Sequence, residues 1–235
     1  MLEVRSLSFS YRKKPIVSGL SFTALPGTVT VLAGPNGSGK STTLSLIAGV
    51  LKPDSGTIEA SGRIGYVPQG TALFEDMTVL DNLRFFASEA KTGMPPRLPF
   101  GVGNLLGKKV SSLSGGMKKR VSICVALVGD PQIFLFDEPV EGLDLLFRDE
   151  LSIVIRNLRA NGRTVLYAGH ETAEYADFYD RLIFIGPDGA RFYTRAELSG
   201  TSGDPEEEAA RLTASYRMLL TGQYRSAAFP RAQEN

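Results

Sequence analysis

Some residue types and patterns are rare in this chain of 235 residues, and their rarity argues against several classes of protein. A single cysteine, Cys124, rules out a disulfide within the chain and suits a reducing cytosol; we expect it to be a buried apolar residue. The 26 basic and 25 acidic residues nearly cancel, so we expect no nucleic-acid partner. Because the sequence has no run of about 18 apolar residues, we expect no membrane-spanning helix. Residues 1–5 are predicted to be a strand rather than a signal peptide.

The sequence does contain a glycine-rich loop with the pattern of a phosphate-binding site. The loop Gly34-Pro35-Asn36-Gly37-Ser38-Gly39-Lys40-Ser41 follows a β-branched apolar stretch at 28–33 and precedes a predicted helix at 41–48. A strand, a G-x-x-x-x-G-K-[ST] loop and a helix in that order make a P-loop. Its glycines allow backbone N–H groups to turn inward around the α- and β-phosphates of a nucleotide at the helix N-terminus.

The polar residues of this loop have separable roles in binding ATP. Lys40 is predicted to reach the β- and γ-phosphates, the Ser41 hydroxyl to ligate Mg²⁺, and Thr42 to add a phosphate contact. The predicted nucleotide-binding residues here are Gly34, Asn36, Gly37, Ser38, Gly39, Lys40, Ser41 and Thr42.

Two adjacent carboxylates end an apolar stretch at 133–136. Neighbouring residues of a strand point to opposite sides, so Asp137 and Glu138 should have different roles. Asp137 can hold Mg²⁺, and Glu138 can polarise the water that attacks the γ-phosphate. Alone, an Asp-Glu-Pro triplet could simply close a strand with solvated acids; the P-loop upstream favours the catalytic interpretation.

A second glycine motif, Leu113-Ser114-Gly115-Gly116-Met117, precedes a Lys-rich predicted helix. Ser114 could act only as a helix cap. The same cap is an anion site at a positive helix end, so Ser114, Gly115 and Gly116 are predicted to bind a γ-phosphate that a second copy presents.

In order and spacing, these motifs resemble the nucleotide-binding domain of an ATP-binding cassette (ABC) transporter over residues 1 to about 195. Tyr11 resembles the aromatic residue that stacks on adenine, although it could be an ordinary edge-strand aromatic. Gln69 resembles the Q-loop residue that reaches Mg²⁺ or the lytic water, or it could be a surface residue after Pro68. Residues 141–144, which include Asp144, resemble the D-loop. His170, the only histidine, resembles the switch residue that contacts the γ-phosphate.

The chain departs from the family pattern at three places. Met117 replaces the usual Gln of the signature, which implies tuning rather than loss of binding. Glu141 stands where Ser or Thr is common, which puts the fine geometry of dimer communication in question. The stretch between Gln69 and Leu113 is short for the family's helical subdomain, and its Gly-Pro-rich part at 92–101 suggests that one helix is reduced to a loop.

The expected fold is α/β, a P-loop NTPase core with an antiparallel β subdomain at 2–9, 16–24 and 57–60 and a short helical subdomain inserted at about 70–125. Residues 1–199 are predicted to form the ATPase domain, and 200–235 a linker, a helix starting near Asp204-Pro205 and a disordered tail. That helix has an apolar stripe of Leu212, Tyr216, Leu219 and Leu220. It could pack on its own domain or contact a partner.

The resemblance implies an ATP-hydrolysing subunit of an ABC transporter, most like a bacterial exporter with separate ATPase and membrane chains. Two copies would close over two ATP molecules with Mg²⁺, a homodimer being favoured over a heterodimer. The segment 74–83 would receive a membrane permease subunit, which would place the chain at the cytoplasmic face of the membrane. The alternative is a soluble ABC ATPase that acts on ribosomes, DNA or a cofactor-assembly scaffold.

Overall fold

The computed structural model describes residues 1–93, 98–140 and 143–223. Several predictions fall outside this part of the chain. They concern residues 94–97 of the Gly-Pro-rich stretch, Glu141 and Gly142 of the predicted D-loop, and the predicted disordered tail at 226–235.

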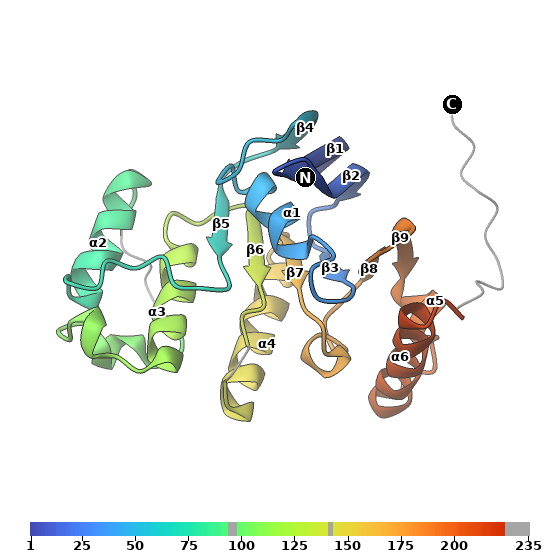
Figure 1. Cartoon of the computed structure of the whole chain (residues 1–235). Helices are drawn as coiled ribbons and strands as arrows, with labels where there is room; N and C mark the ends of the chain where they lie inside the picture. Colours follow the sequence, from blue (N-terminus) through green and yellow to red (C-terminus); the bar gives the residue numbers. More distant parts are fainter. Residues whose placement is uncertain (94–97, 141–142, 224–235) are drawn as a thin grey trace.

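The described chain contains two β-sheets, as the predicted α/β class requires. An antiparallel sheet has the order β2-β1-β4, from β1 (Leu2–Tyr11), β2 (Lys14–Ala24) and β4 (Ser55–Ala60). A larger sheet has the order β5-β6-β7-β3-β8-β9 and is parallel except for β9. Its strands are β3 (Val29–Ala33), β5 (Ile64–Val67), β6 (Ile133–Asp137), β7 (Thr164–Ala168), β8 (Arg181–Gly186) and β9 (Gly189–Thr194). Figure 1 shows the antiparallel strands lying above the parallel sheet, with α1 (Lys40–Ile47) between them.

Side chains alternate between the two faces of the parallel sheet and build a separate core on each face. In β6, Phe134 and Phe136 belong to one core, while Ile133 and Leu135 belong to the other. This period of two is what a strand covered on both sides requires. The second core includes Leu44 and the buried side chains of β1 and β2, so α1 is held between the sheets by apolar packing.

The helical subdomain forms a lobe at one side of the parallel sheet (Figure 1). It contains α2 (Val79–Glu89), the 3-10 turns η1 (Val102–Leu105) and η2 (Val110–Ser112), and α3 (Gly115–Leu127). The expected helix around 74–83 begins only at Val79, because the Thr78 hydroxyl accepts the Asp81 N–H at 3.1 Å and caps the helix there. The described residues between α2 and α3 include these two 3-10 turns, and the loss of a helix at 92–101 stays a prediction.

The last elements continue from the parallel sheet into a pair of helices. The helix α4 (Leu145–Ala160) precedes β7, and the 3-10 turn η3 (Thr172–Glu174) follows it. The helices α5 (Arg195–Ser199) and α6 (Pro205–Leu220) follow β9. In α6, Leu212, Tyr216 and Leu219 are buried in the core that also holds Phe134 and Phe136. Leu220 was expected on the same stripe, but it is 47% exposed because α6 turns it away from the sheet at its last residue.

The helix α6 therefore packs on the ATPase core, which is one of the two alternatives that the sequence left open. The predicted boundary between residues 1–199 and 200–235 stays a prediction. Over the described residues, no helix is both long enough and apolar enough to cross a bilayer.

The burial of α6 generates a stability prediction. Leu212→Ala removes a side chain with no exposed surface, so the free energy of unfolding should fall by about 2–5 kcal/mol. Leu220→Ala, the matched control, should change it by less than about 0.5 kcal/mol because Leu220 is half exposed. Chemical denaturation monitored by circular dichroism measures both values, and equal losses would contradict the packing of α6 described above.

Candidate functional site

A cavity of about 400 Å³ opens at the edge of the parallel sheet where its strands end. It is lined by residues from five separate segments of the chain: Tyr11, Ile16, Asn36, Gly37, Ser38, Gly39, Lys40, Ser41, Thr42, Gln69, Glu138 and His170. All of them except Ile16 are predicted site residues.

The glycines of the loop between β3 and α1 are required by close approach of other backbone segments. Gly34 has φ +145°, and a Cβ there would collide with the carbonyl oxygen of Ile185. Gly39 has φ +99°, and a Cβ would lie 2.9 Å from the carbonyl oxygen of Ile16. Both contacts explain why only glycine fits, and they place the loop against β8 and β2.

Lys40 is a buried cation at the floor of the cavity. Its Nζ donates to the carbonyl oxygens of Gly34 at 2.9 Å and Pro35 at 3.2 Å. Burial lowers the pKa of Lys40, and the nearby carboxylates of Glu138 and Asp137 oppose that shift. The loop thus curls around its own lysine and presents a positive charge beside two acids.

Asp137 ends β6 beneath this loop. Its Oδ1 accepts a hydrogen bond from the Ser41 hydroxyl at 2.8 Å. Burial raises the pKa of Asp137, whereas the Ser41 hydrogen bond and the cations of Lys119 and Lys40 lower it. A hydroxyl and a carboxylate side by side fit Mg²⁺, which in nucleotide sites uses one or two protein oxygens together with phosphates. Among the described residues, no cluster of three or more His, Cys, Asp or Glu side chains could hold a metal.

Glu138 lies where the segments that follow β5, β6 and β7 meet. Its backbone has φ +45° and its N–H donates to the Ala168 carbonyl at 3.0 Å, which turns the side chain toward the cavity. Its Oε2 accepts from Gln69 Nε2 at 2.9 Å, and its Oε1 lies 3.3 Å from His170 Nδ1. A left-handed conformation at a non-glycine residue stores strain and is typical of functional sites.

Lys119 holds the Gln69 segment in place, and it is not among the site residues that the sequence predicts. It lies in α3 and is only 6% exposed, and its Nζ donates to the carbonyl oxygens of Pro68 and Gln69, both at 2.8 Å. A basic triplet on a helix usually forms a solvated face. The signal that could have found Lys119 is its spacing from Ile123 and Ala126, which places all three on the buried face of α3.

A half-buried carboxylate, Glu174, supports the segment that presents His170. The Tyr167 hydroxyl donates to Glu174 Oε2 at 3.0 Å, and a Cβ on Gly169 would lie 2.8 Å from the same oxygen. Burial raises the pKa of Glu174, and the nearby His170 lowers it. Glu174 was also missed, because nothing in a single acid on a short turn signals burial.

Tyr11 lies at the end of β1, on the rim of the cavity. Its ring is 49% exposed and packs edge-on against Phe9, with ring centroids 4.8 Å apart. Although β1 is the middle strand of its sheet, its pairing with β4 ends at Ser8, so at Tyr11 it pairs with β2 alone and both interpretations of Tyr11 stay predictions. An exposed aromatic face beside a phosphate-binding loop is suited to stacking on a base.

Ser114, Gly115, Gly116 and Asp144 do not line this cavity. Ser114 caps α3, its hydroxyl accepting the Met117 N–H at 3.3 Å, and a Cβ on Gly115 would meet open space. Asp144 caps α4 by accepting the Phe147 N–H at 2.8 Å, and it lies 3.9 Å from Arg120 of α3. These residues form a neighbouring surface at the start of α3 and α4.

Comparison with known proteins gives consistent matches. The sequence model of a family described as ABC transporter matches residues 17–141. The Nod factor export ATP-binding protein I of Paraburkholderia xenovorans (strain LB400) is 38% identical over 204 residues, which cover 78% of this chain and 67% of that protein. The linearmycin resistance ATP-binding protein LnrL of Bacillus subtilis (strain 168) is 35% identical over 205 residues, 79% of this chain and 66% of LnrL. The chain thus spans about two thirds of the length of these relatives.

Solved structures show the same fold. An ATP binding subunit of an ABC transporter superposes with a TM-score of 0.76 at 26% identity, covering 91% of this chain and 99% of that one. A dimeric post-hydrolysis state of an ATP-binding cassette bound to ADP and Pi superposes with a TM-score of 0.68 at 20% identity, covering 83% and 98%.

The contacts of Lys119 generate a prediction about ATP hydrolysis. Lys119→Gln loses a charged donor to the Gln69 segment, so kcat should fall about tenfold or more while the Kd for ATP changes little. Lys118→Gln is the control, because the ion pair of the half-buried Lys118 is with the exposed Glu75 and not with the Gln69 segment. Steady-state hydrolysis and nucleotide titration measure both constants. A Lys119→Gln protein with parental kcat and only a lower Tm would reduce Lys119 to a packing role.

Proposed function

Because this chain belongs to the ABC transporter family and is an ATP hydrolase of that family, we propose that it is the subunit whose ATP cycle drives export through a separate membrane subunit. The observation that supports this best is the convergence of Gln69, Glu138 and His170 on one side of the P-loop cavity. The relatives named for Nod factor export and linearmycin resistance support the export direction.

ATP would bind with its adenine on Tyr11 and its phosphates in the loop from Gly34 to Thr42. The backbone N–H groups of the loop and the Lys40 ammonium would hold the phosphates. Ser41 and Asp137 would hold Mg²⁺, with Gln69 as a further oxygen ligand. Bound there, Mg²⁺ would neutralise charge that develops on the phosphates during transfer.

Hydrolysis would depend on how Glu138 is presented. Its carboxylate would accept a proton from the attacking water, and His170 would contact the γ-phosphate from the other side. The hydrogen bonds from Gln69 and His170 reach different oxygens of Glu138, so these two residues fix the orientation of the carboxylate. A side chain that hydrogen bonds already hold in its reactive orientation loses less conformational entropy on reaching the transition state.

A second copy of the chain would complete the site. Ser114, Gly115 and Gly116 are at the open N-terminus of α3 and outside the cavity, so a γ-phosphate bound by the partner copy could reach them. Asp144 lies at the same surface, near Arg120. We propose a homodimer rather than a heterodimer, closed by ATP and reopened by hydrolysis.

The membrane subunit would contact an exposed apolar surface on α2 and on the segment before it. This surface consists of Phe74 and Met77, which precede α2, and of Phe85 within α2, and all three are exposed. The rings of Phe74 and Phe85 pack edge-on with centroids 4.9 Å apart, so the surface is ordered before any partner binds. Contiguous exposed apolar side chains are typical of interaction sites. Such a complex would hold the chain at the cytoplasmic face of the membrane.

The role of Glu138 generates a biochemical prediction. Glu138→Gln keeps the size and the hydrogen-bonding reach of the side chain but cannot take up a proton. It should bind ATP with near-parental affinity, lower kcat by about 10²-fold or more and accumulate as a dimer with ATP. Hydrolysis assays and size-exclusion chromatography with light scattering test this. Hydrolysis at the parental rate would exclude Glu138 as the base.

The export proposal is tested by capturing the partner. Tagged Glu138→Gln protein, purified with ATP from detergent-solubilised native membranes, should retain a polytopic membrane protein in stoichiometric amount. Adding Phe85→Ser should remove that protein but keep the ATP-dependent dimer, whereas Met218→Ser, a matched exposed residue on α6, should change neither. Recovery of ribosomes or soluble scaffold proteins alone would identify the chain as a soluble ABC ATPase instead.

A further inference from the structure

We propose that α6 is a positioning element of the ATP site, in which Thr213 fixes the turn after His170. This proposal rests on the roles proposed above for His170 and the P-loop. It assigns a function to a helix that lies outside the motifs and outside the cavity. Three sets of contacts support it: an anchor at the N-terminal end of α6, a hydroxyl pair at its middle, and an aromatic contact near its C-terminal end.

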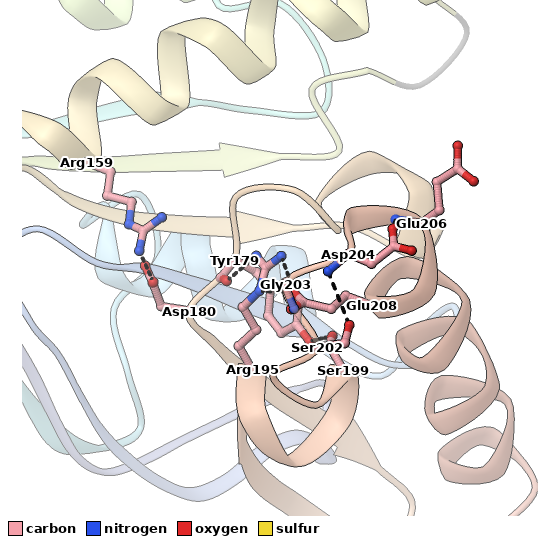
Figure 2. A network of polar contacts seen from close by, with 10 residues as sticks. All are labelled: Arg159, Tyr179, Asp180, Arg195, Ser199, Ser202, Gly203, Asp204, Glu206 and Glu208. Atoms are coloured by element: carbon pink, nitrogen blue, oxygen red, sulfur yellow. Dashed lines mark hydrogen bonds and ion pairs between the residues drawn. The ribbon is translucent and has the colours of Figure 1, made fainter.

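The anchor is an ion pair between α5 and α6 (Figure 2). Glu208 Oε2 accepts from Arg195 Nη2 at 2.9 Å and from Nε at 3.2 Å, and its Oε1 accepts the Gly203 N–H at 3.1 Å. The Arg195 guanidinium lies 5.3 Å from the centroid of the Tyr179 ring, and it donates to the Tyr179 carbonyl oxygen at 3.3 Å. Two Arg195 nitrogens share the oxygen Oε2 while the Gly203 N–H binds Oε1, so both oxygens of the Glu208 carboxylate are held. The first turns of α6 are therefore held against the segment between η3 and β8.

The hydroxyl pair joins α6 to the turn that follows His170. Thr213 Oγ1 lies 2.8 Å from Thr172 Oγ1, and it also donates to the Ala209 carbonyl of its own helix at 3.0 Å. A hydroxyl has one proton, so Thr172 must be the donor in the pair. Thr172 is buried and begins η3, two residues after His170. The proton arrangement thus fixes the turn relative to the helix.

The aromatic contact joins α6 to β8. The Tyr216 ring is buried and packs edge-on against Phe184 of β8, with ring centroids 6.1 Å apart. The helix α6 is therefore held against the strand that lies beside β3 in the parallel sheet.

The turn that α6 contacts lies beside the P-loop, because β7 pairs with β3 along residues 165–168. The P-loop follows β3 and presents Lys40, and the turn after β7 presents His170. Thr213 bonds α6 to this turn, and Tyr216 packs α6 on β8, the other neighbour of β3. Displacement of α6 would consequently change the distance from His170 to a γ-phosphate held by the P-loop, without any change in the residues that touch ATP.

His170 provides a direct readout, because it is the only histidine in the chain. Protein without a polyhistidine tag, labelled with ¹³C-histidine, gives one imidazole signal. Thr213→Val, which removes only the hydroxyl, should shift or broaden that signal in the ATP-bound Glu138→Gln protein. In the otherwise parental chain it should lower kcat about fivefold, the usual factor for one neutral hydrogen bond. Thr213→Ser should restore both properties.

The matched control is Thr221→Val, because Thr221 is exposed and, within residues 1–93, 98–140 and 143–223, its hydroxyl bonds only to carbonyls of its own helix. It should leave the His170 signal and kcat at parental values. If Thr213→Val also left both unchanged and lowered only the Tm, the positioning role would be overturned. The His170 signal reports on α6 whether or not a membrane partner is captured, so failure of the export proposal would remain distinguishable.

Discussion

The parallel pairing of the strands in the central sheet is the constraint on which the rest of the structure depends. Parallel strands all end at the same edge, and here the register places Asp137 of β6 opposite Ala168 of β7, and Leu32 of β3 opposite Ala168 as well. In the chain, the P-loop comes directly after β3, Glu138 directly after β6, and His170 just after β7. Residues that are far apart in the chain are thereby brought to one cavity by backbone hydrogen bonds alone.

Charge balance is the second requirement of this edge. Two cations, Lys40 and Lys119, and two acids, Asp137 and Glu138, are all largely buried. Burial penalises each charged form, as the lowered pKa of Lys40 and the raised pKa of Asp137 show, and the opposite charges offset part of that penalty. Lys119 contributes from α3, so the electrostatics of the nucleotide site include the helix that begins with Ser114. Lys119 thus adds a charged link between the helical lobe and the core to the apolar packing that they share.

Elements outside the motifs support the site from both sides. Lys119 bonds to the Pro68 and Gln69 carbonyls from the helical lobe, and Thr213 bonds to Thr172 from the C-terminal helix. In each case a side chain on a rigid helix contacts a loop that lines the cavity. Loops alone lose their geometry readily, whereas a helix packed in the core moves as a unit. The site therefore depends on α3 and α6 as well as on the sheet.

The sequence by itself determined the features that depend on local geometry. The P-loop, the strands and the N-terminus of α6 follow from glycine conformations, period-two patterns and capping residues, each within a few positions. Tertiary structure alone decided which side chains meet. Glu138 is separated by 69 positions from Gln69 and by 32 from His170, and Thr213 by 41 from Thr172. It also turned Lys119 inward and Leu220 outward, because burial depends on the neighbouring surface that only the folded chain provides.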